Sequence, residues 1–244
     1  QTPVVSFMLA DILRDAGLPE GYLHVLGGEG PTVGEWLLED ERIDLYSFTG
    51  SVPVGRRIKE RTGLRRVALE LGSNSATIVH SDADPVAAAR ACAQGGFANA
   101  GQVCISVQRV YVHESIRDVF VRELTLQAEA LAVGDPRDES TGVGPMISER
   151  EAARVHEWIG EAIAQGASAL TGNRREGALV WPTVLVDVKP DMRVMRREVF
   201  GPVICVASYR SLEEAIDLVN DSEYGLQAGI MTRDLHAAME ATRG

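Results

Sequence analysis

The sequence has few cysteines and no long hydrophobic run. Its three cysteines, Cys92, Cys104 and Cys205, are widely spaced along 244 residues and form no CxxC pair. This spacing argues against a disulfide framework or a thiolate zinc site, so we expect a reducing compartment, the cytoplasm. The longest nearly apolar stretch, residues 178–186, has about half of the roughly 20 residues that a membrane span needs. No membrane partner is therefore expected.

Basic residues are scarce relative to acidic ones. The chain has 24 Lys and Arg against 35 Asp and Glu, which gives a net charge of −11. A surface that coats nucleic acid is therefore not expected. Hydrophobic residues make up 45% and charged residues 24%, as in a folded globular protein. These values favour a small molecule as the partner.

Helical and strand patterns alternate over the first 72 residues. We predict a helix that begins near Pro3 and ends at Gly17, then a strand over 22–26, a helix over 32–39, a strand over 43–48, a helix over 52–61 and a strand over 66–71. Strict alternation with short connections is typical of a parallel sheet with helices on its faces. Because the pattern begins on a helix, we expect its first strand to precede this chain, which is then part of a longer one.

A second unit is predicted to start near residue 73. Its expected strands are 76–80, 107–112, 203–207 and 227–231, and its expected helices begin at Pro85, Ser115, Ser148 and Ser211. Asp84 is a good N-cap for the Pro85 helix. Ser148 and Ser211 each precede a glutamate at the spacing of a capping box. The second unit is therefore expected to be α/β as well.

The three cysteines differ in their surroundings. Cys92 lies at helical spacing with Ala88 and Ala89, and Cys205 lies inside an apolar strand, so both are interpreted as small core residues. Residues 99–102 interrupt a helix and place Cys104 at a turn, where backbone amides can face a ligand. Taken alone, this loop would still favour a buried thiol.

Four short segments together identify a family. They are Phe48-Thr49-Gly50-Ser51, Leu69-Glu70-Leu71-Gly72, Asn99-Ala100-Gly101-Gln102-Val103-Cys104 and Glu198-Val199-Phe200-Gly201-Pro202. In this order and at this spacing they resemble the aldehyde dehydrogenase superfamily. The resemblance covers essentially the whole chain but only the middle of the usual family sequence. Ser73 stands where the family pattern has a second glycine.

The resemblance implies a fold and an activity. The fold would be α/β, of the aldehyde dehydrogenase type. Residues 1–72 would form the second half of the NAD(P)-binding domain, with a partial Rossmann-type parallel sheet, and residues 73–244 an α/β catalytic domain that is incomplete at its C-terminus. The full-length enzyme would be a homodimer or homotetramer. It would oxidise a small aldehyde to a carboxylic acid with NAD or NADP as cofactor.

The resemblance also assigns the catalytic residues. Cys104 would be the thiolate that adds to the aldehyde carbonyl, with its own backbone N–H in the oxyanion hole. Glu70 would activate the water that hydrolyses the thioester. The apolar residues 67–69 before Glu70 are expected to desolvate its carboxylate, as the role of general base requires.

Two glycine-rich turns compete for the cofactor's phosphates. Gly28-Glu29-Gly30 imitates a dinucleotide fingerprint, but its spacing to Gly34 is one residue too long. Gly50-Ser51 lies between a predicted strand and a predicted helix, where free N–H groups can bind pyrophosphate. The resemblance selects this second turn. It further assigns Leu71, Glu198 and Phe200 to cofactor binding, with Glu198 on the ribose hydroxyls.

Two other charged segments are interpreted as structural. The basic run Arg56, Arg57, Lys59, Arg61, Arg65 and Arg66 could suggest nucleic acid or the extra phosphate of NADP. No aromatic residue interleaves it, so we interpret it as a solvated helix face with Val54, Ile58 and Leu64 turned inward. Residues 80–84 lack the downstream ligands of a calcium loop. No metal is predicted.

Two alternatives remain open. A coenzyme-A-acylating relative would pass the acyl group to a thiol rather than to water, although Glu70 at a base-like position disfavours this. A truncated chain of the family could also fold without turning anything over. Residues 104–109 bear a faint likeness to family members that act on small, sometimes anionic aldehydes such as lactaldehyde or phosphonoacetaldehyde.

Overall fold

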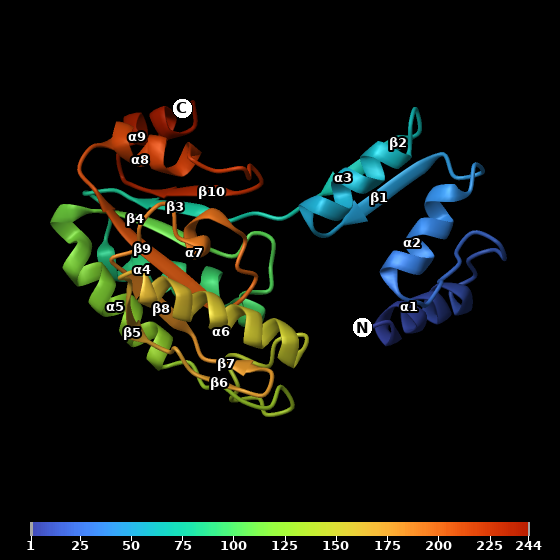
Figure 1. Cartoon of the computed structure of the whole chain (residues 1–244), viewed down its shortest axis with the longest axis horizontal. Helices are drawn as coiled ribbons and strands as arrows, with labels where there is room; N and C mark the ends of the chain where they lie inside the picture. The colour runs from blue at the N-terminus through green and yellow to red at the C-terminus, as the bar shows by residue number, and fades with distance from the viewer. Residues whose placement is uncertain (1, 244) are drawn as a thin grey trace. The chain divides into compact units, whose positions relative to one another are not determined.

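The structure, a computed structural model, describes residues 2–243 and divides into two compact units (Figure 1). Unit 1 runs up to Leu71 and unit 2 starts at Gly72. None of the helices described for residues 2–243 combines the length and the apolar character needed to cross a bilayer. Each unit is built from alternating helices and strands, so the predicted α/β class is confirmed.

Unit 1 contains one β-α-β crossover. Strands β1 (Leu45–Thr49) and β2 (Arg66–Glu70) are parallel and are joined by helix α3 (Val52–Arg61). Helices α1 (Val4–Asp15) and α2 (Gly30–Glu39) precede them. Parallel neighbours need a crossover connection, and a helix supplies it here.

The strand predicted over 22–26 is wrong. This segment has no regular secondary structure, and Tyr22 and Leu26 are largely exposed. A strand needs a hydrogen-bonded neighbour, and within residues 2–243 no strand pairs with this segment. The apolar run therefore remains an irregular connection between α1 and α2.

The interpretation of the basic run needs a correction. Ile58 is buried, but Val54 is half exposed and Leu64 is fully exposed, because Leu64 lies in the turn after α3. Arg57 forms an ion pair with Glu35 of α2 at 2.6 Å, and Arg61 contacts the same carboxylate. The basic face of α3 is thus in part an ion-pair surface toward α2.

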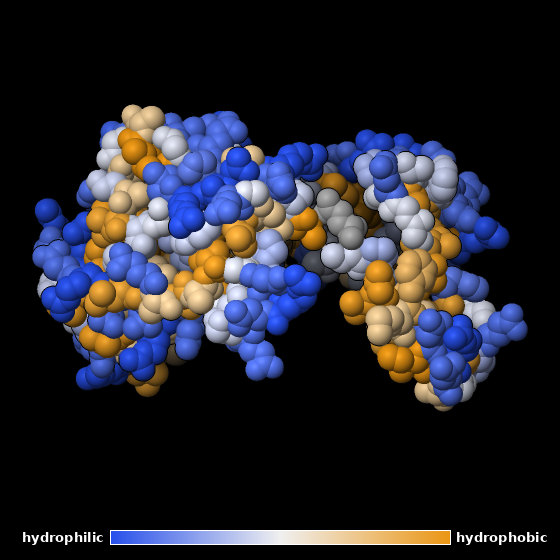
Figure 2. Space-filling view, turned by 90° about the horizontal axis from the view of Figure 1, so that it is seen from below, coloured by the Kyte–Doolittle hydropathy of each residue, from blue (hydrophilic) through white to orange (hydrophobic). Residues whose placement is uncertain are grey.

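Helix α1 lies on the surface of unit 1 with little burial. None of its residues is buried, and Val5, Met8 and Ile12 are each more than half exposed. Apolar surface is visible on this unit in Figure 2. Hydrophobic burial scales with the area removed from water, so α1 adds little to the stability of unit 1 as described.

Unit 2 is organised around a six-stranded sheet with the order β10-β3-β4-β9-β8-β5. Its strands are β3 (Ala76–Val79), β4 (Arg109–His113), β5 (Ser168–Thr171), β8 (Thr183–Val186), β9 (Val203–Tyr209) and β10 (Ala228–Met231). All neighbours are parallel except β5, which is antiparallel to β8. A small hairpin, β6 (Arg175–Glu176) and β7 (Leu179–Val180), lies outside this sheet. The four predicted strands of this half are confirmed.

Helices cover both faces of the six-stranded sheet. Helices α4 (Pro85–Phe97) and α5 (Arg117–Glu129) lie against one face, and α8 (Leu212–Asn220) and α9 (Leu235–Ala241) against the other (Figure 1). Helices α6 (Glu149–Ala164) and α7 (Arg193–Arg196) complete the unit. The side chains of Asp84, Ser148 and Ser211 accept hydrogen bonds from the first turns of α4, α6 and α8. The predicted N-caps are therefore confirmed.

Candidate active site

Three segments that are distant in the sequence precede three neighbouring strands of unit 2. Residues 72–75 lead into β3, residues 101–108 into β4 and residues 198–202 into β9. In the sheet register Ala76 lies opposite Arg109, and Arg109 lies opposite Cys205. Parallel neighbours begin at the same sheet edge. The topology therefore gathers the Cys104 loop and the Glu198–Phe200 segment at the amino edge of this sheet, whereas open parallel sheets usually bind ligands at the carboxyl edge.

The loop before Cys104 has an unusual backbone. Asn99, Ala100 and Gly101 have φ values of 51°, 54° and 69°, in the left-handed region that non-glycine residues rarely adopt. The Gln102 N–H donates to the Asn99 carbonyl at 3.1 Å, and the Gln102 side-chain oxygen accepts from the Ile147 N–H at 2.8 Å. Such strain persists where the surroundings fix it. The loop ends in a turn over 103–106, and this turn holds Cys104.

Two of the signature segments pack directly against each other. A Cβ placed on Gly101 would overlap the carbonyl group of Gly201. A Cβ on Gly201 would in turn lie 2.7 Å from a methyl group of Val155 in α6. Only glycine allows backbone to approach backbone this closely. These contacts explain why both segments carry glycine.

The three thiols differ in exposure as expected. Cys92 and Cys205 are fully buried, whereas Cys104 is half-buried. Desolvation raises the pKa of each buried thiol to about 12. A thiolate is the reactive form, so of the three cysteines Cys104 is the one able to act as nucleophile.

This difference predicts selective alkylation. In folded protein at about pH 8, iodoacetamide is expected to modify Cys104 and to leave Cys92 and Cys205 intact, because neither buried thiol ionises there. Peptide mass spectrometry locates the adduct, and the same reaction in urea should modify all three cysteines. Native modification of Cys92 or Cys205 at a rate similar to that of Cys104 would contradict the assignment.

Glu198 presents a partly buried carboxylate. Its Oε1 atom accepts a hydrogen bond from the Ser73 N–H at 2.9 Å. Burial raises the pKa of the Glu198 carboxyl above its usual range, and the Ser73 N–H and the charge of Arg154 offset part of the rise. The side chain is half-buried, so one side of the carboxylate is fixed while the group remains reachable for a ligand.

The contacts of Glu198 also explain the neighbouring residues 72 and 73. A Cβ on Gly72 would overlap the Glu198 carboxylate, so a larger residue at this position would displace the end of that side chain. Ser73 has no positive φ, and its hydroxyl shares a 3.1 Å hydrogen bond with that of Ser75. The Ser73 side chain therefore fits where the family pattern has its second glycine.

Phe200 is exposed and has a φ of 50°. A bulky residue in this region costs of order 1–3 kcal/mol. The aromatic ring is thus presented at the surface beside Gly201 by a strained backbone. This geometry is suited to packing against a flat ligand. No local sequence pattern signals the strain.

Unit 1 brings together the other predicted site residues. The Gly50 N–H donates to the backbone carbonyl of Glu70 at 3.0 Å, and the Leu71 side chain covers Gly55 of α3. Ser51 is the N-cap residue of α3, yet its side chain makes no capping hydrogen bond. Its hydroxyl is therefore not used in capping at this helix N-terminus.

The expected desolvation of Glu70 by residues 67–69 is wrong. Val67 and Leu69 are half-buried, whereas Arg66, Ala68 and Glu70 are exposed. Alternate residues of a strand face opposite sides, so Glu70 shares its side with exposed neighbours. Adjacency along the strand does not place an apolar group over this carboxylate.

Four buried or half-buried polar residues of unit 2 were not found from the sequence. The side chains of Gln108, Asn74 and Arg154 bind backbone groups of residues 194–199. Arg109 is 97% buried, and its guanidinium donates to the carbonyls of Leu218 and Val219 at the end of α8, where a positive charge is favourable. These partners lie up to 121 positions away, and no local pattern signals such contacts.

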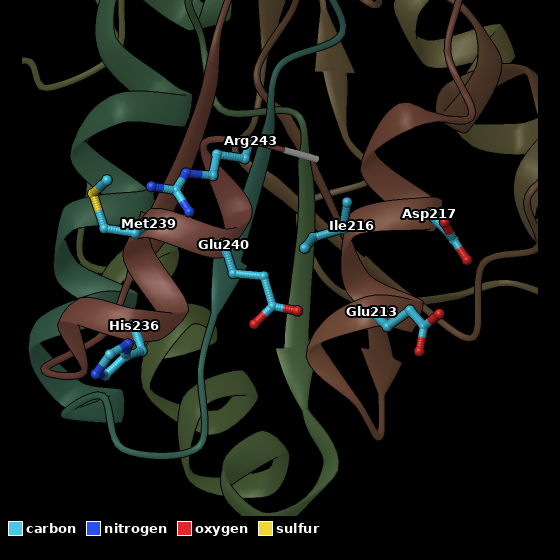
Figure 3. A pocket seen from close by; sticks show the side chains of 7 residues that line it. All are labelled: Glu213, Ile216, Asp217, His236, Met239, Glu240 and Arg243. Atoms are coloured by element: carbon cyan, nitrogen blue, oxygen red, sulfur yellow. The ribbon is translucent and has the colours of Figure 1, made fainter.

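A separate hollow of unit 2 lies between α8 and α9. Figure 3 shows Glu213 and Asp217 from α8 and Glu240 from α9 along it. Both helices follow the carboxyl ends of β9 and β10, away from the amino edge. The hollow contains none of the signature residues. Within residues 2–243, no three His, Cys, Asp or Glu side chains gather as metal ligands.

The whole chain matches a known family. Residues 1–244 match the aldehyde dehydrogenase family. The 3-sulfolactaldehyde dehydrogenase of Priestia aryabhattai is 52% identical over 242 residues, which are 99% of this chain and 51% of that protein. The chain belongs to the aldehyde dehydrogenase family, and the resemblance drawn from its four signature segments is confirmed.

Solved structures agree with this assignment. An NAD-dependent aldehyde dehydrogenase from Sinorhizobium meliloti matches with a TM-score of 0.96 and 40% identity, over 99% of this chain and 49% of that one. An NADP-dependent glyceraldehyde-3-phosphate dehydrogenase from Bacillus halodurans, complexed with NADP, matches with a TM-score of 0.93 and 39% identity, over 97% and 49%. The chain spans about half the length of the relatives that it matches.

Proposed function

We propose that the protein oxidises an aldehyde to a carboxylic acid with NAD or NADP, through covalent intermediates on Cys104. The observation that carries this proposal is the strained loop that packs through Gly101 against the Gly201 backbone and leads into the half-buried Cys104 thiol. Membership of the aldehyde dehydrogenase family supports it.

In the proposed reaction the Cys104 thiolate adds to the aldehyde carbonyl carbon. A carbon–sulfur bond forms and the carbonyl oxygen becomes an oxyanion, which the backbone N–H of Cys104 stabilises. Loss of hydride from this carbon leaves a thioester. Water then attacks the thioester, the carbon–sulfur bond breaks, and the acid and the Cys104 thiolate are released.

We propose that Glu70 accepts the proton of the attacking water. The carboxylate ends strand β2, and its backbone carbonyl holds the Gly50 N–H. A carboxylate on a rigid strand end is a suitable general base. Its own strand neighbours leave the carboxylate exposed.

The chain's own residues fit a nicotinamide dinucleotide. The Ser51 hydroxyl makes no capping hydrogen bond at the start of α3. It can therefore bind the pyrophosphate of the cofactor together with the free N–H groups of this helix N-terminus. Glu198 offers a carboxylate to the ribose hydroxyls. Phe200 offers an exposed ring, and Leu71, which lies beside Gly55, offers an apolar contact to the cofactor. When bound, the cofactor accepts the hydride that leaves the substrate.

The raised pKa of Glu198 predicts a pH dependence of cofactor binding. A carboxyl with a raised pKa takes up its proton in milder acid than an exposed glutamate does, and it then loses acceptor capacity. Dinucleotide affinity should therefore begin to fall at a higher pH than it would with an exposed glutamate, and the loss should reach roughly tenfold once the carboxyl is protonated, as the loss of a hydrogen bond to a charged group implies. Fluorescence titration measures it. Glu198→Gln should bind the dinucleotide weakly at every pH. If the affinity of this variant still changed with pH as in the wild type, Glu198 would not be the group that binds the cofactor.

For the substrate we propose a small, anionic aldehyde. The relative that is 52% identical is named for 3-sulfolactaldehyde, and the likeness of residues 104–109 points to the same class. Assays of the full-length protein should compare sulfonated, phosphorylated, carboxylated and neutral short aldehydes. A preference for neutral aldehydes would contradict this part of the proposal.

We further propose that the full-length protein works in the cytoplasm as a homodimer or homotetramer, without a nucleic-acid or membrane partner. The net charge of −11 and the three separate cysteines support this setting. Light scattering at several concentrations tests the assembly, and a monomer at all of them would contradict it.

Absorbance of the reduced nicotinamide tests the activity itself. Full-length protein is incubated with each aldehyde and with NAD or NADP, and the product is identified by mass spectrometry. Free acid formed without added coenzyme A would exclude the acylating alternative. No reduced nicotinamide with any pairing would overturn the proposed function and favour a non-catalytic chain.

A further inference from the structure

The segment that carries Glu198 is held by side chains. Residues 194–199 run from helix α7 toward strand β9 and take part in no sheet. The Asn74 side chain donates to the Met195 carbonyl at 3.0 Å, and Arg154 donates to the Val199 carbonyl at 2.9 Å. The Glu198 N–H donates to the Tyr224 hydroxyl at 3.3 Å. Buried backbone groups need such partners.

Gln108 supplies three more of these hydrogen bonds from one side chain. Its Nε2 atom donates to the carbonyls of Val194 and Arg197, both at 2.7 Å. Its Oε1 atom accepts from the Val199 N–H at 2.8 Å. The residue is only 5% exposed. Both amide protons are therefore used, and the bonds to Arg197 and Val199 bracket Glu198 on either side.

The backbone of Gln108 fixes it to the same edge of the sheet. Its N–H donates to the Ser75 carbonyl at 3.2 Å, and its carbonyl accepts from the Cys205 N–H at 2.8 Å. Gln108 thus lies just before β4, four positions after Cys104, and touches the starts of β3 and β9. A displacement of this side chain would move the Glu198 segment relative to the Cys104 loop.

We propose that Gln108 is a positioning residue for cofactor binding, which sets the place of the Glu198 carboxylate through the backbone on both sides of it. The inference rests on the proposed function. An amide of this length is required, because a carboxylate lacks both donors and would set oxygen against two carbonyl oxygens. Asparagine keeps the amide but is one methylene too short.

The test compares Gln108→Glu and Gln108→Asn with Thr183→Val in the full-length protein. Thr183 is also fully buried in the sheet, and its hydroxyl bonds the Asn173 N–H and the Trp181 carbonyl, neither of which belongs to residues 194–199. Both Gln108 variants should raise the dinucleotide dissociation constant and KM at least roughly tenfold, as unsatisfied buried groups imply. Thr183→Val should lower the melting temperature but change the dissociation constant less than about threefold. An equal loss of affinity in Thr183→Val, or none in the Gln108 variants, would overturn the proposal.

Hydrogen exchange separates this proposal from the proposed function. In wild-type protein without cofactor, the Val199 amide should be strongly protected, and in the Gln108 variants its exchange should rise at least roughly tenfold while amides of β8 stay protected. Rapid exchange of Val199 in the wild type would overturn the positioning role even if neither variant folds. Protection of Val199 in a wild type that binds no dinucleotide would leave the structural role standing and overturn the proposed function instead.

Discussion

Replacing Cys104 by alanine is expected to lower kcat of the full-length protein at least ~1000-fold, because no other group can form the carbon–sulfur bond of the proposed reaction. The two remaining thiols are fully buried, with pKa values raised to about 12, so neither can substitute. Absorbance of the reduced nicotinamide under saturating substrates gives kcat, and serine at this position should also be inactive because its hydroxyl is a poorer nucleophile.

Cys92→Ala is the matched control for this substitution. It removes a sulfur from the core beneath α4, where the residue is fully buried, so it should lower the melting temperature while kcat stays within about threefold. Dinucleotide affinity of Cys104→Ala should match that of the wild type, which shows that the site is intact. More than a tenth of wild-type activity in Cys104→Ala would contradict the role of this thiol.

The helices and parallel strands of unit 2 could be predicted because their signals are local. Asp84, Ser148 and Ser211 sit at the N-caps that their spacing indicated. The order of the strands was not predicted from the sequence. Once that order is known, the segments that precede parallel neighbours must begin at one edge of the sheet. The meeting of the Cys104 loop with residues 198–202 is a consequence of this topology.

The failures arise where structure depends on distant partners. Residues 22–26 have a strand's composition but no neighbour within the described chain. Glu70 follows an apolar run, yet strand alternation turns it to the exposed side. Gln108 was not identified from the sequence for the same reason, because its partners are distant along the chain. Its three hydrogen bonds reach 86 to 91 positions along the chain, so nothing in residues 104–109 reveals its function in packing.

Gly101→Ala is expected to give the largest loss of stability among substitutions at the site. The residue is buried with a φ of 69°, and an added Cβ would overlap the Gly201 carbonyl. A left-handed alanine costs about 1–2 kcal/mol, and forced movement of packed backbone adds about 1–3 kcal/mol. We therefore expect a loss of about 3 kcal/mol or more in the free energy of unfolding, measured from urea transitions of the full-length protein.

Gly160→Ala is expected to change the free energy of unfolding in the opposite direction in the same experiment. Gly160 lies on the exposed side of α6 with nothing within 4 Å of an added Cβ, so alanine should stabilise the helix by about 0.5–1 kcal/mol. If Gly101→Ala folds at all, its Cys104 loop should be displaced and iodoacetamide should modify Cys104 at an altered rate. Wild-type stability in Gly101→Ala would mean that residues 101 and 201 do not pack backbone to backbone, and with that the arrangement that presents Cys104 would be wrong.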